Sequence, residues 1–331
     1  MATGAGLGSF RMEQVPGLRM ADAPHPLKAP HMAVDEFLPR SLAEELRAAI
    51  DAHFDEPQHH RPDVHQVWNY WYVPDLYTYL RTQPEKVIPR PLVKRFHQAL
   101  THWARQTLGM AGVTWPNLSL YVDGCQQGLH NDSTNGRFGF VYSLTWDDRK
   151  TIGGETIVLR EGDLYRSNMT QDAAGWGLYD LIQPRFNRLA IFDDRMPHGV
   201  QRVEGSMDPL EGRFVLHGHI REEGPVVEGA LSPQAVAQAI DDALGDHAAS
   251  LASGDSPLHG PLVLRIAIAA SGEVQNVRPL VDRLARPDGG PTDDAVARIV
   301  EMVASIRFPS AESSSQVNAP LIIGGPLPDK G

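Results

Sequence analysis

The feature that most constrains the fold is a series of short strand-like segments between residues 117 and 220, separated by turns rich in Gly, Asp and Asn. Helical patterns precede these segments and do not alternate with them. Such an order favours a mainly β domain with flanking helices, built as an antiparallel sandwich. A double-sheet jelly roll accommodates these strands and protects their edges. The expected strands cover 118–122, 138–144, 155–159, 188–192, 199–203 and 213–220.

Two helical patterns come before this region, after a short strand and turn at 32–39. Apolar residues recur every four positions from Leu42 to Phe54. Ser41 and Glu44 have the spacing of a capping box at the start of that helix. A second helix is expected over 91–108. We expect the first helix to pack against the outside of the sheet.

The last third of the chain has a different pattern. Ser232 followed by Pro233 is typical of a helix start, because serine caps the first turn and proline suits its first position. Strand-like segments and a second helical pattern follow. The predicted organisation is a flexible segment (1–30), a first domain (31–222, with its jelly-roll core at about 117–222), a linker (223–230) and a small α+β domain (231–327).

The composition argues against several functions. The chain has 30 basic and 41 acidic residues and a net charge of −11, so it has no overall attraction for nucleic acid or anionic membranes. No apolar run approaches the roughly 18 residues of a membrane span. The N-terminus does not look like a signal peptide, and the single cysteine, Cys125, precludes an internal disulfide. We therefore expect a cytoplasmic protein.

Three residues suggest a metal site. His130 and Asp132 are two positions apart, so on an extended segment both side chains point the same way. His198 lies 66 positions after Asp132 and also follows a predicted strand. Two imidazoles and one carboxylate are typical ligands of Fe(II) in oxygenases, where they leave positions open for a co-substrate and O2. The alternative is that each histidine is merely hydrogen-bonded near a turn.

Other polar residues suggest a co-substrate site. Arg213 opens the last strand of the series, where a guanidinium can hold the distal carboxylate of a dicarboxylic keto acid. Tyr121 can donate its hydroxyl to the same carboxylate or to a metal-bound oxygen. The alternatives are a surface salt bridge of Arg213 with Glu211 and core packing of Tyr121. By strand alternation, His217 and His219 share the face of Arg213, so they are expected to point into the barrel, either as hydrogen-bond donors around the metal ligands or as part of the pocket lining.

Several motifs in this region follow one another in a characteristic order: Tyr121-x-x-Gly124, His130-x-Asp132, Asn135-Gly136-Arg137, Tyr142-Ser143-Leu144, Gly153-Gly154-Glu155-Thr156, the segments 183–189 and 192–200, and Arg213. Together they resemble the prolyl-4-hydroxylase-like branch of the 2-oxoglutarate/Fe(II) oxygenases, which includes the oxygen-sensing prolyl hydroxylases.

This resemblance implies a double-stranded β-helix that uses Fe(II), 2-oxoglutarate and O2 to hydroxylate an amino-acid residue in a peptide or protein, or a free metabolite. It places iron on the two histidines and the aspartate, and 2-oxoglutarate on Arg213 with help from Tyr121. It suggests Arg137 near the substrate entrance. Ser143 stands where oxygen-sensing members carry a second tyrosine near the co-substrate, and Arg213 follows His198 at a longer interval than in those members.

The C-terminal region carries the motifs 261–266, 271–274 and 306–309, which resemble the C-terminal domains of TonB-like and gliding-motility (AgmX/PglI-type) proteins. The resemblance implies an interaction or dimerisation module without chemistry. Two functional alternatives remain open at this point. One is a His/His/Asp zinc hydrolase on a cupin-like barrel, and the other is a binding protein that acts through its C-terminal domain.

Three further segments allow two interpretations each. The insertion 160–180 is either a lid over the site or a surface loop. The aromatic run 68–72 either lines a substrate entrance or, as we expect, packs in the core. His59, His60 and His65 are expected to lie in a polar loop and not to bind metal, because Pro62 interrupts any helix that would align them.

Overall fold

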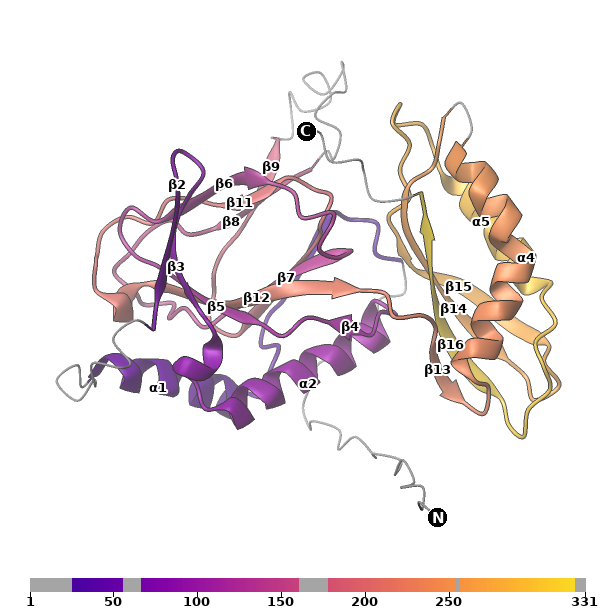
Figure 1. Ribbon diagram of the computed structural model, residues 1–331, viewed down its shortest axis with the longest axis horizontal. Coiled ribbons are helices and arrows are strands. Elements are labelled where there is room, and N and C mark those ends of the chain that lie inside the picture. Colours follow the sequence, from indigo (N-terminus) through magenta and orange to yellow (C-terminus); the bar gives the residue numbers. More distant parts are fainter. Residues whose placement is uncertain (1–25, 56–66, 161–177, 254–255, 325–331) are drawn as a thin grey trace, which may run out of the picture.

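A computed structural model describes residues 26–55, 67–160, 178–253 and 256–324 (Figure 1). As expected, a mainly β jelly roll is followed by a small α+β domain. In these ranges twelve strands form an antiparallel sheet that curls into a nearly closed barrel, in the order β1-β10-β7-β12-β5-β3-β6-β11-β8-β9, with β2 beside β3 and β4 beside β12. The strands are β1 (His31–Val34), β2 (Asn69–Val73), β3 (Tyr77–Thr82), β4 (Gly112–Val113), β5 (Asn117–Tyr121), β6 (Gln126–His130), β7 (Phe138–Ser143), β8 (Thr156–Leu159), β9 (Tyr179–Ile182), β10 (Arg188–Asp193), β11 (His198–Val200) and β12 (Arg213–Arg221).

Two helices, α1 (Arg40–Asp55) and α2 (Arg90–Thr107), lie along one side of the barrel (Figure 1). Their apolar residues recur three or four positions apart, so each helix buries a single face against the sheet. The expected capping box is wrong. Helix α1 begins one residue before Ser41, and Glu44 accepts a hydrogen bond from Arg40 Nε at 2.8 Å.

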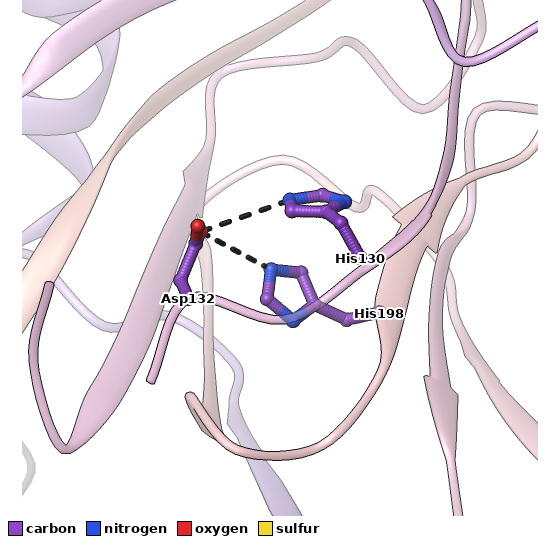
Figure 2. A group of neighbouring side chains, drawn as sticks. All are labelled: His130, Asp132 and His198. Atoms are coloured by element: carbon purple, nitrogen blue, oxygen red, sulfur yellow. Dashed lines mark ion pairs between the residues drawn. The ribbon is translucent and has the colours of Figure 1, made fainter. Parts of the chain in front are cut away.

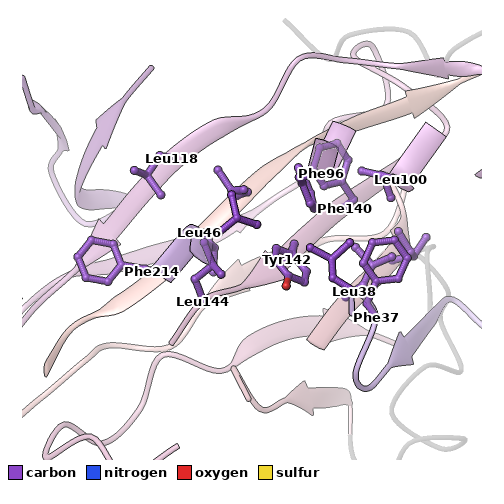
Figure 3. Close-up of a cluster of buried hydrophobic side chains, with 14 of the residues drawn as sticks. Phe37, Leu38, Leu46, Phe96, Leu100, Leu118, Phe140, Tyr142, Leu144 and Phe214 are labelled. Carbon is purple, nitrogen blue, oxygen red and sulfur yellow. The ribbon is translucent and has the colours of Figure 1, made fainter. Parts of the chain in front are cut away.

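The main core lies between the two helices, α1 and α2, and the sheet (Figure 3). Phe96 and Leu100 of α2 are buried with Phe140 and Tyr142 of β7. The rings of Phe96 and Tyr142 are 4.9 Å apart, and the Tyr142 hydroxyl donates to Asn187 Oδ1 at 2.8 Å. Burial of each such side chain contributes about 1.5–3 kcal/mol. This core fixes β7 and, through the pairing of β7 with β12, the strand that carries Arg213.

All six expected strands are present, although β11 ends at Val200 and not at residue 203. Strands β2, β3, β4, β6 and β9 were not predicted from the sequence. The segment Gln126–His130 has no apolar alternation, because one side of β6 borders the cavity described below and not the core. Pattern alone therefore does not identify such a strand.

The C-terminal domain is a four-stranded antiparallel sheet in the order β13-β16-β14-β15, with two helices against it (Figure 1). Ser232 caps the first helix as predicted, since its Oγ accepts a hydrogen bond from Ala235 N at 3.1 Å. The segment expected to be a linker (223–230) contains strand β13, which pairs with β16. The elements are β13 (Val226–Gly229), α4 (Pro233–Ser253), β14 (Gly260–Ile268), β15 (Val274–Asp282), α5 (Asp293–Ala304) and β16 (Ser315–Ile323).

A buried carboxylate joins the two domains. Asp193 is inaccessible to solvent and lies 2.6 Å from Arg195 Nη2 and 3.0 Å from Nε of Arg283, which belongs to the C-terminal domain. Burial alone would raise the pKa of Asp193, but the two guanidiniums lower it below its usual value. Arg195 also donates to the carbonyl oxygens of His259 and Arg283. The loop that follows β10 is thus held by the C-terminal domain.

The N-terminal segment also takes part in this junction. Leu27 forms a parallel bridge with Val281 at the end of β15, and Lys28 Nζ pairs with Asp282 at 3.3 Å and with Asp293 at 2.8 Å. Leu27 and Lys28 belong to the segment 1–30, which was expected to be flexible. That expectation is wrong for these two residues, because backbone pairing with a strand far along the chain holds them.

We predict that Arg283→Met lowers the free energy of unfolding by about 2–3 kcal/mol, because Asp193 then keeps only Arg195 as its cationic partner. Arg307→Met is the control. Arg307 pairs with Glu273 on the surface of the same domain, where such a pair contributes less than about 1 kcal/mol. Urea unfolding of both variants measures the difference, and equal losses would contradict this role of Arg283.

Some expectations lie outside the described residues: most of the insertion 160–180, the first 25 residues, and His59, His60 and His65. Among the helices that the structure describes, none combines the length and apolar character needed to cross a membrane.

Candidate active site

The jelly roll brings His130, Asp132 and His198 together. His130 ends β6, His198 opens β11, and the two residues are directly paired across these strands. Their Nε2 atoms lie 3.7 Å and 3.5 Å from Asp132 Oδ2, and the two rings are 4.4 Å apart. Figure 2 shows both imidazoles turned toward the carboxylate. One potential ligand atom from each residue therefore faces a common point.

Hydrogen bonds orient all three groups for metal binding. His130 Nδ1 lies 2.9 Å from the Gly128 carbonyl oxygen, and His198 Nδ1 lies 2.9 Å from that of Met196. A carbonyl only accepts, so each Nδ1 carries a proton and Nε2 is the ring nitrogen that a metal can bind. Asn135 Nδ2 donates to Asp132 Oδ1 at 3.1 Å, which leaves Oδ2 facing the imidazoles. This donor set fits a divalent transition metal such as Fe(II).

The electrostatics of the three residues are coupled. Burial would raise the pKa of Asp132, but the hydrogen bonds and charges of His130 and His198 lower it well below its usual range. Burial likewise opposes protonation of His130, yet Asp132 and the Gly128 carbonyl raise its pKa. Asp132 therefore remains ionised at neutral pH.

Arg213 is buried in the same cavity with part of its hydrogen-bonding capacity unused. Its Nη2 donates to Thr156 Oγ1 at 3.1 Å, and its guanidinium lies 4.8 Å from the centre of the Tyr121 ring. Among the described residues, Nε and Nη1 have no partner. The alternative of a surface salt bridge with Glu211 is wrong, because Glu211 pairs with Lys150 at 2.9 Å. An unsatisfied buried guanidinium is costly, and a carboxylate ligand would satisfy it.

Tyr121 lies beside Arg213 and is also buried. Its hydroxyl donates to Gln127 Oε1 at 3.2 Å, and burial raises its pKa. Gln127 Nε2 is in turn 3.4 Å from His130 Nε2. Gln127 thus lies between Tyr121, which is predicted to contact the co-substrate, and His130, which is a predicted metal ligand. The sequence did not indicate Gln127, because a glutamine on a strand without apolar alternation forms no motif.

These residues line one cavity of about 430 Å³. Its wall combines the three metal-ligand candidates with Arg213, aromatic rings and two more histidines. The residues that line the cavity include Trp71, Tyr79, Arg81, Tyr121, His130, Asp132, Thr156, His198, Arg213, His217 and His219.

His217 and His219 line the cavity, as strand alternation predicts. His217 Nε2 is hydrogen-bonded to Ser119 Oγ at 2.8 Å, and burial, with Arg81 nearby, lowers its pKa to about 3. His219 Nδ1 donates to Asp194 Oδ2 at 3.0 Å. Burial raises the pKa of Asp194 to about 6. The carboxylate of Asp194 is not part of the cavity wall, so it supports His219 from behind.

Two predicted site residues are placed elsewhere. Ser143, expected near the co-substrate, does not line the cavity, and its hydroxyl accepts a hydrogen bond from Thr145 N at 3.3 Å. Arg137, expected at the substrate entrance, forms two hydrogen bonds with Glu222 at 2.8 and 2.9 Å. It is likewise not part of the cavity wall, because Glu222 draws it to the side of the barrel.

The aromatic run 68–72 is mostly exposed, contrary to the expectation of core packing. Tyr70, Trp71 and Tyr72 are 62%, 43% and 60% exposed on β2, and Trp71 lines the cavity. Trp68 alone turns inward and stacks on Phe54. A run of aromatic residues is compatible with both a core and a cavity mouth, so the pattern could not decide between them.

We predict that His217→Gln reduces the acid sensitivity of folding. An unfolded histidine takes up a proton near pH 6.5, whereas folded His217 does so only near pH 3. The wild-type protein therefore loses stability as the pH falls below about 6.5, by up to about 1.4 kcal/mol per pH unit from this residue. Urea unfolding at pH 7, 6 and 5 measures both proteins. Parallel losses in wild type and variant would contradict the assignment.

The chain was compared with protein families, curated proteins and solved structures. No protein-family model matches the chain, and no curated protein matches it. Among solved structures, it is similar to a prolyl hydroxylase from Trichoplax adhaerens in complex with a hypoxia inducible factor peptide fragment (14% identity, TM-score 0.43, covering 59% of this chain and 84% of that one). It is also similar to a Pseudomonas putida prolyl-4-hydroxylase (16%, 0.41, 59% and 94%) and to the non-heme alpha ketoglutarate dependent epimerase SnoN (11%, 0.40, 57% and 77%).

Proposed function

We propose that this protein is an Fe(II)- and 2-oxoglutarate-dependent dioxygenase that hydroxylates an unactivated C–H bond. The substrate class is an amino-acid residue in a peptide or protein, or a free amino-acid-derived metabolite. The observation that carries the proposal is that one cavity contains both the His130, Asp132 and His198 cluster and a buried guanidinium, Arg213, with unused donors.

The residues of the chain have distinct roles in this proposal. His130, Asp132 and His198 hold Fe(II), and Arg213 binds the distal carboxylate of 2-oxoglutarate with Thr156 beside it. When bound, iron and the keto acid supply O2-dependent decarboxylation to succinate and CO2, coupled to hydroxylation. Tyr121 and Gln127 close the wall between the two binding positions. The protein contributes geometry, charge and exclusion of water.

The proposal favours an oxygenase over a zinc hydrolase. Both need two histidines and a carboxylate, but activation of water by zinc does not itself use a buried cation with free donors in the same cavity. A dicarboxylic keto acid that chelates the metal at one end accounts for both features. Metal analysis and O2-dependent succinate formation separate the two activities, since a hydrolase releases no succinate.

We predict a visible charge-transfer band when Fe(II) and 2-oxoglutarate are added to the protein without O2. Asp132→Ala should abolish the band. Arg213→Met should raise the 2-oxoglutarate concentration needed for half of it by about 100-fold or more, because a charge-assisted double hydrogen bond is lost. Arg95→Gln is the control, since Arg95 pairs with Glu45 on the helical surface. Absence of the band from the wild-type protein would refute the proposal.

The finer assignments are also proposals. Membership of the prolyl-4-hydroxylase-like branch is supported by the order of the motifs. A TonB-like C-terminal domain is supported by its motifs and α+β make-up. Self-association through it is favoured by strand β15, whose described pairings are with β14 and, at its end, with Leu27. Light scattering that finds a monomer at every concentration would contradict self-association.

A further inference from the structure

A row of stacked rings connects two arginines along the cavity wall. The Arg213 guanidinium lies 4.8 Å from the centre of the Tyr121 ring, which stacks on Tyr79 at 5.1 Å. Tyr79 stacks on Trp71 at 6.1 Å, and the Arg81 guanidinium lies 4.9 Å from the centre of the Trp71 ring. All five residues line the cavity. Each guanidinium is thus held over the last ring at its own end of the row.

Strand register explains this row. Trp71 of β2 is directly opposite Tyr79 of β3, and Arg213 of β12 is directly opposite Tyr121 of β5. Residues opposite one another on adjacent strands share a face, so their side chains stack across the sheet. Arg81 follows Tyr79 by two positions on β3 and therefore points to the same face.

The row leads from the surface to the interior. Trp71 is 43% exposed, whereas Tyr79, Tyr121 and Arg213 are each at most 3% exposed. Arg81 is half-buried beside Trp71. Arg213 therefore lies at the deep end of the cavity and Arg81 near its mouth. The stacking distances from Trp71 to Tyr79 and from Tyr79 to Tyr121 separate the two guanidiniums. A ligand that is bound to Arg213 and the metal therefore leaves Arg81 available.

The charges in the cavity leave Arg81 uncompensated. In the described ranges, Asp132 is the one carboxylate that lines the cavity, and no carboxylate forms an ion pair with Arg81. The Tyr79 hydroxyl, its hydrogen-bonding neighbour, is neutral. When the proposed metal and co-substrate are bound, the negative charge of Asp132 balances the positive charge of Arg213. The two negative charges of 2-oxoglutarate balance the two positive charges of a divalent metal. One positive charge then remains in a partly desolvated site, and it favours an anionic group on the substrate.

We propose that the substrate carries a carboxylate and that Arg81, held over Trp71 at the cavity mouth, binds it. The guanidinium presents donors in a fixed plane, which suits a carboxylate, and the indole face beneath it restricts its motion. This inference rests on the proposed function, because it assigns the second ligand of the same cavity. It narrows the substrate to acids such as N-acylated amino acids or the C-terminal residue of a peptide.

The test compares N-acetyl amino acids with their carboxamides, using succinate release by the Fe(II)-loaded full-length protein. We expect turnover of at least one free acid, with kcat/KM about tenfold or more above that of its amide. Arg81→Gln should lower kcat/KM for the acid by about 10- to 100-fold, mainly through KM, and should lower kcat/KM for the amide much less. Arg81→Lys should keep part of the preference, because it keeps the charge but loses the planar fork.

Two controls separate this inference from the proposed function. The anaerobic charge-transfer band should form equally in wild type and Arg81→Gln, which shows that folding, metal and 2-oxoglutarate binding are intact. If the wild type lacks the band, the proposed function itself fails. If the band forms but acids and amides react equally, no acid reacts, or Arg81→Gln stays within twofold of wild type, the carboxylate assignment is overturned. Arg95→Gln should match wild type throughout.

Discussion

The buried guanidinium of Arg213 is the constraint on which the arrangement of the cavity depends. A charge with unsatisfied donors in the interior opposes folding, so the surrounding structure must hold it in place. The pairing of β12 with β5 and β7 does so from both sides, and the Tyr121 ring covers one face of the guanidinium. The alternation of the same strand then brings His217 and His219 to the cavity. A single strand thereby sets the spacing of three polar residues.

Strand alternation made much of this predictable from the sequence. Arg213, His217 and His219 share a face because side chains repeat every two residues, and His130 and Asp132 are close for the same reason. The pairing of His198 with His130 could only be inferred from the need for a third ligand, since register between distant strands is set by the whole barrel. The resemblance of the motifs to a known family indicated that His198 lies beside His130 and Asp132, which local periodicity cannot show.

The expectations that failed depended on partners distant in sequence. Arg137 was expected at the entrance, but Glu222, 85 residues later, holds it elsewhere. The half-exposed strand β2 carries aromatic residues on both faces, so its pattern could not show which ring meets the cavity. The position of Arg81 in the cavity could not be predicted from the sequence, because strand β3 was not recognised and a single arginine forms no motif. Its importance became visible only with the ring row that connects it to Arg213.

The junction between the domains has a consequence for how the chain reaches its final form. Leu27 pairs with Val281, and Asp193 accepts a hydrogen bond from Arg283, so contacts at the junction join residues 254 and 90 positions apart. Contacts of such sequence separation form slowly, because a long loop must close before they stabilise anything. During synthesis this junction therefore forms only after the C-terminal sheet has emerged, and the loop that follows β10 is among the last parts of the molecule to reach its final position.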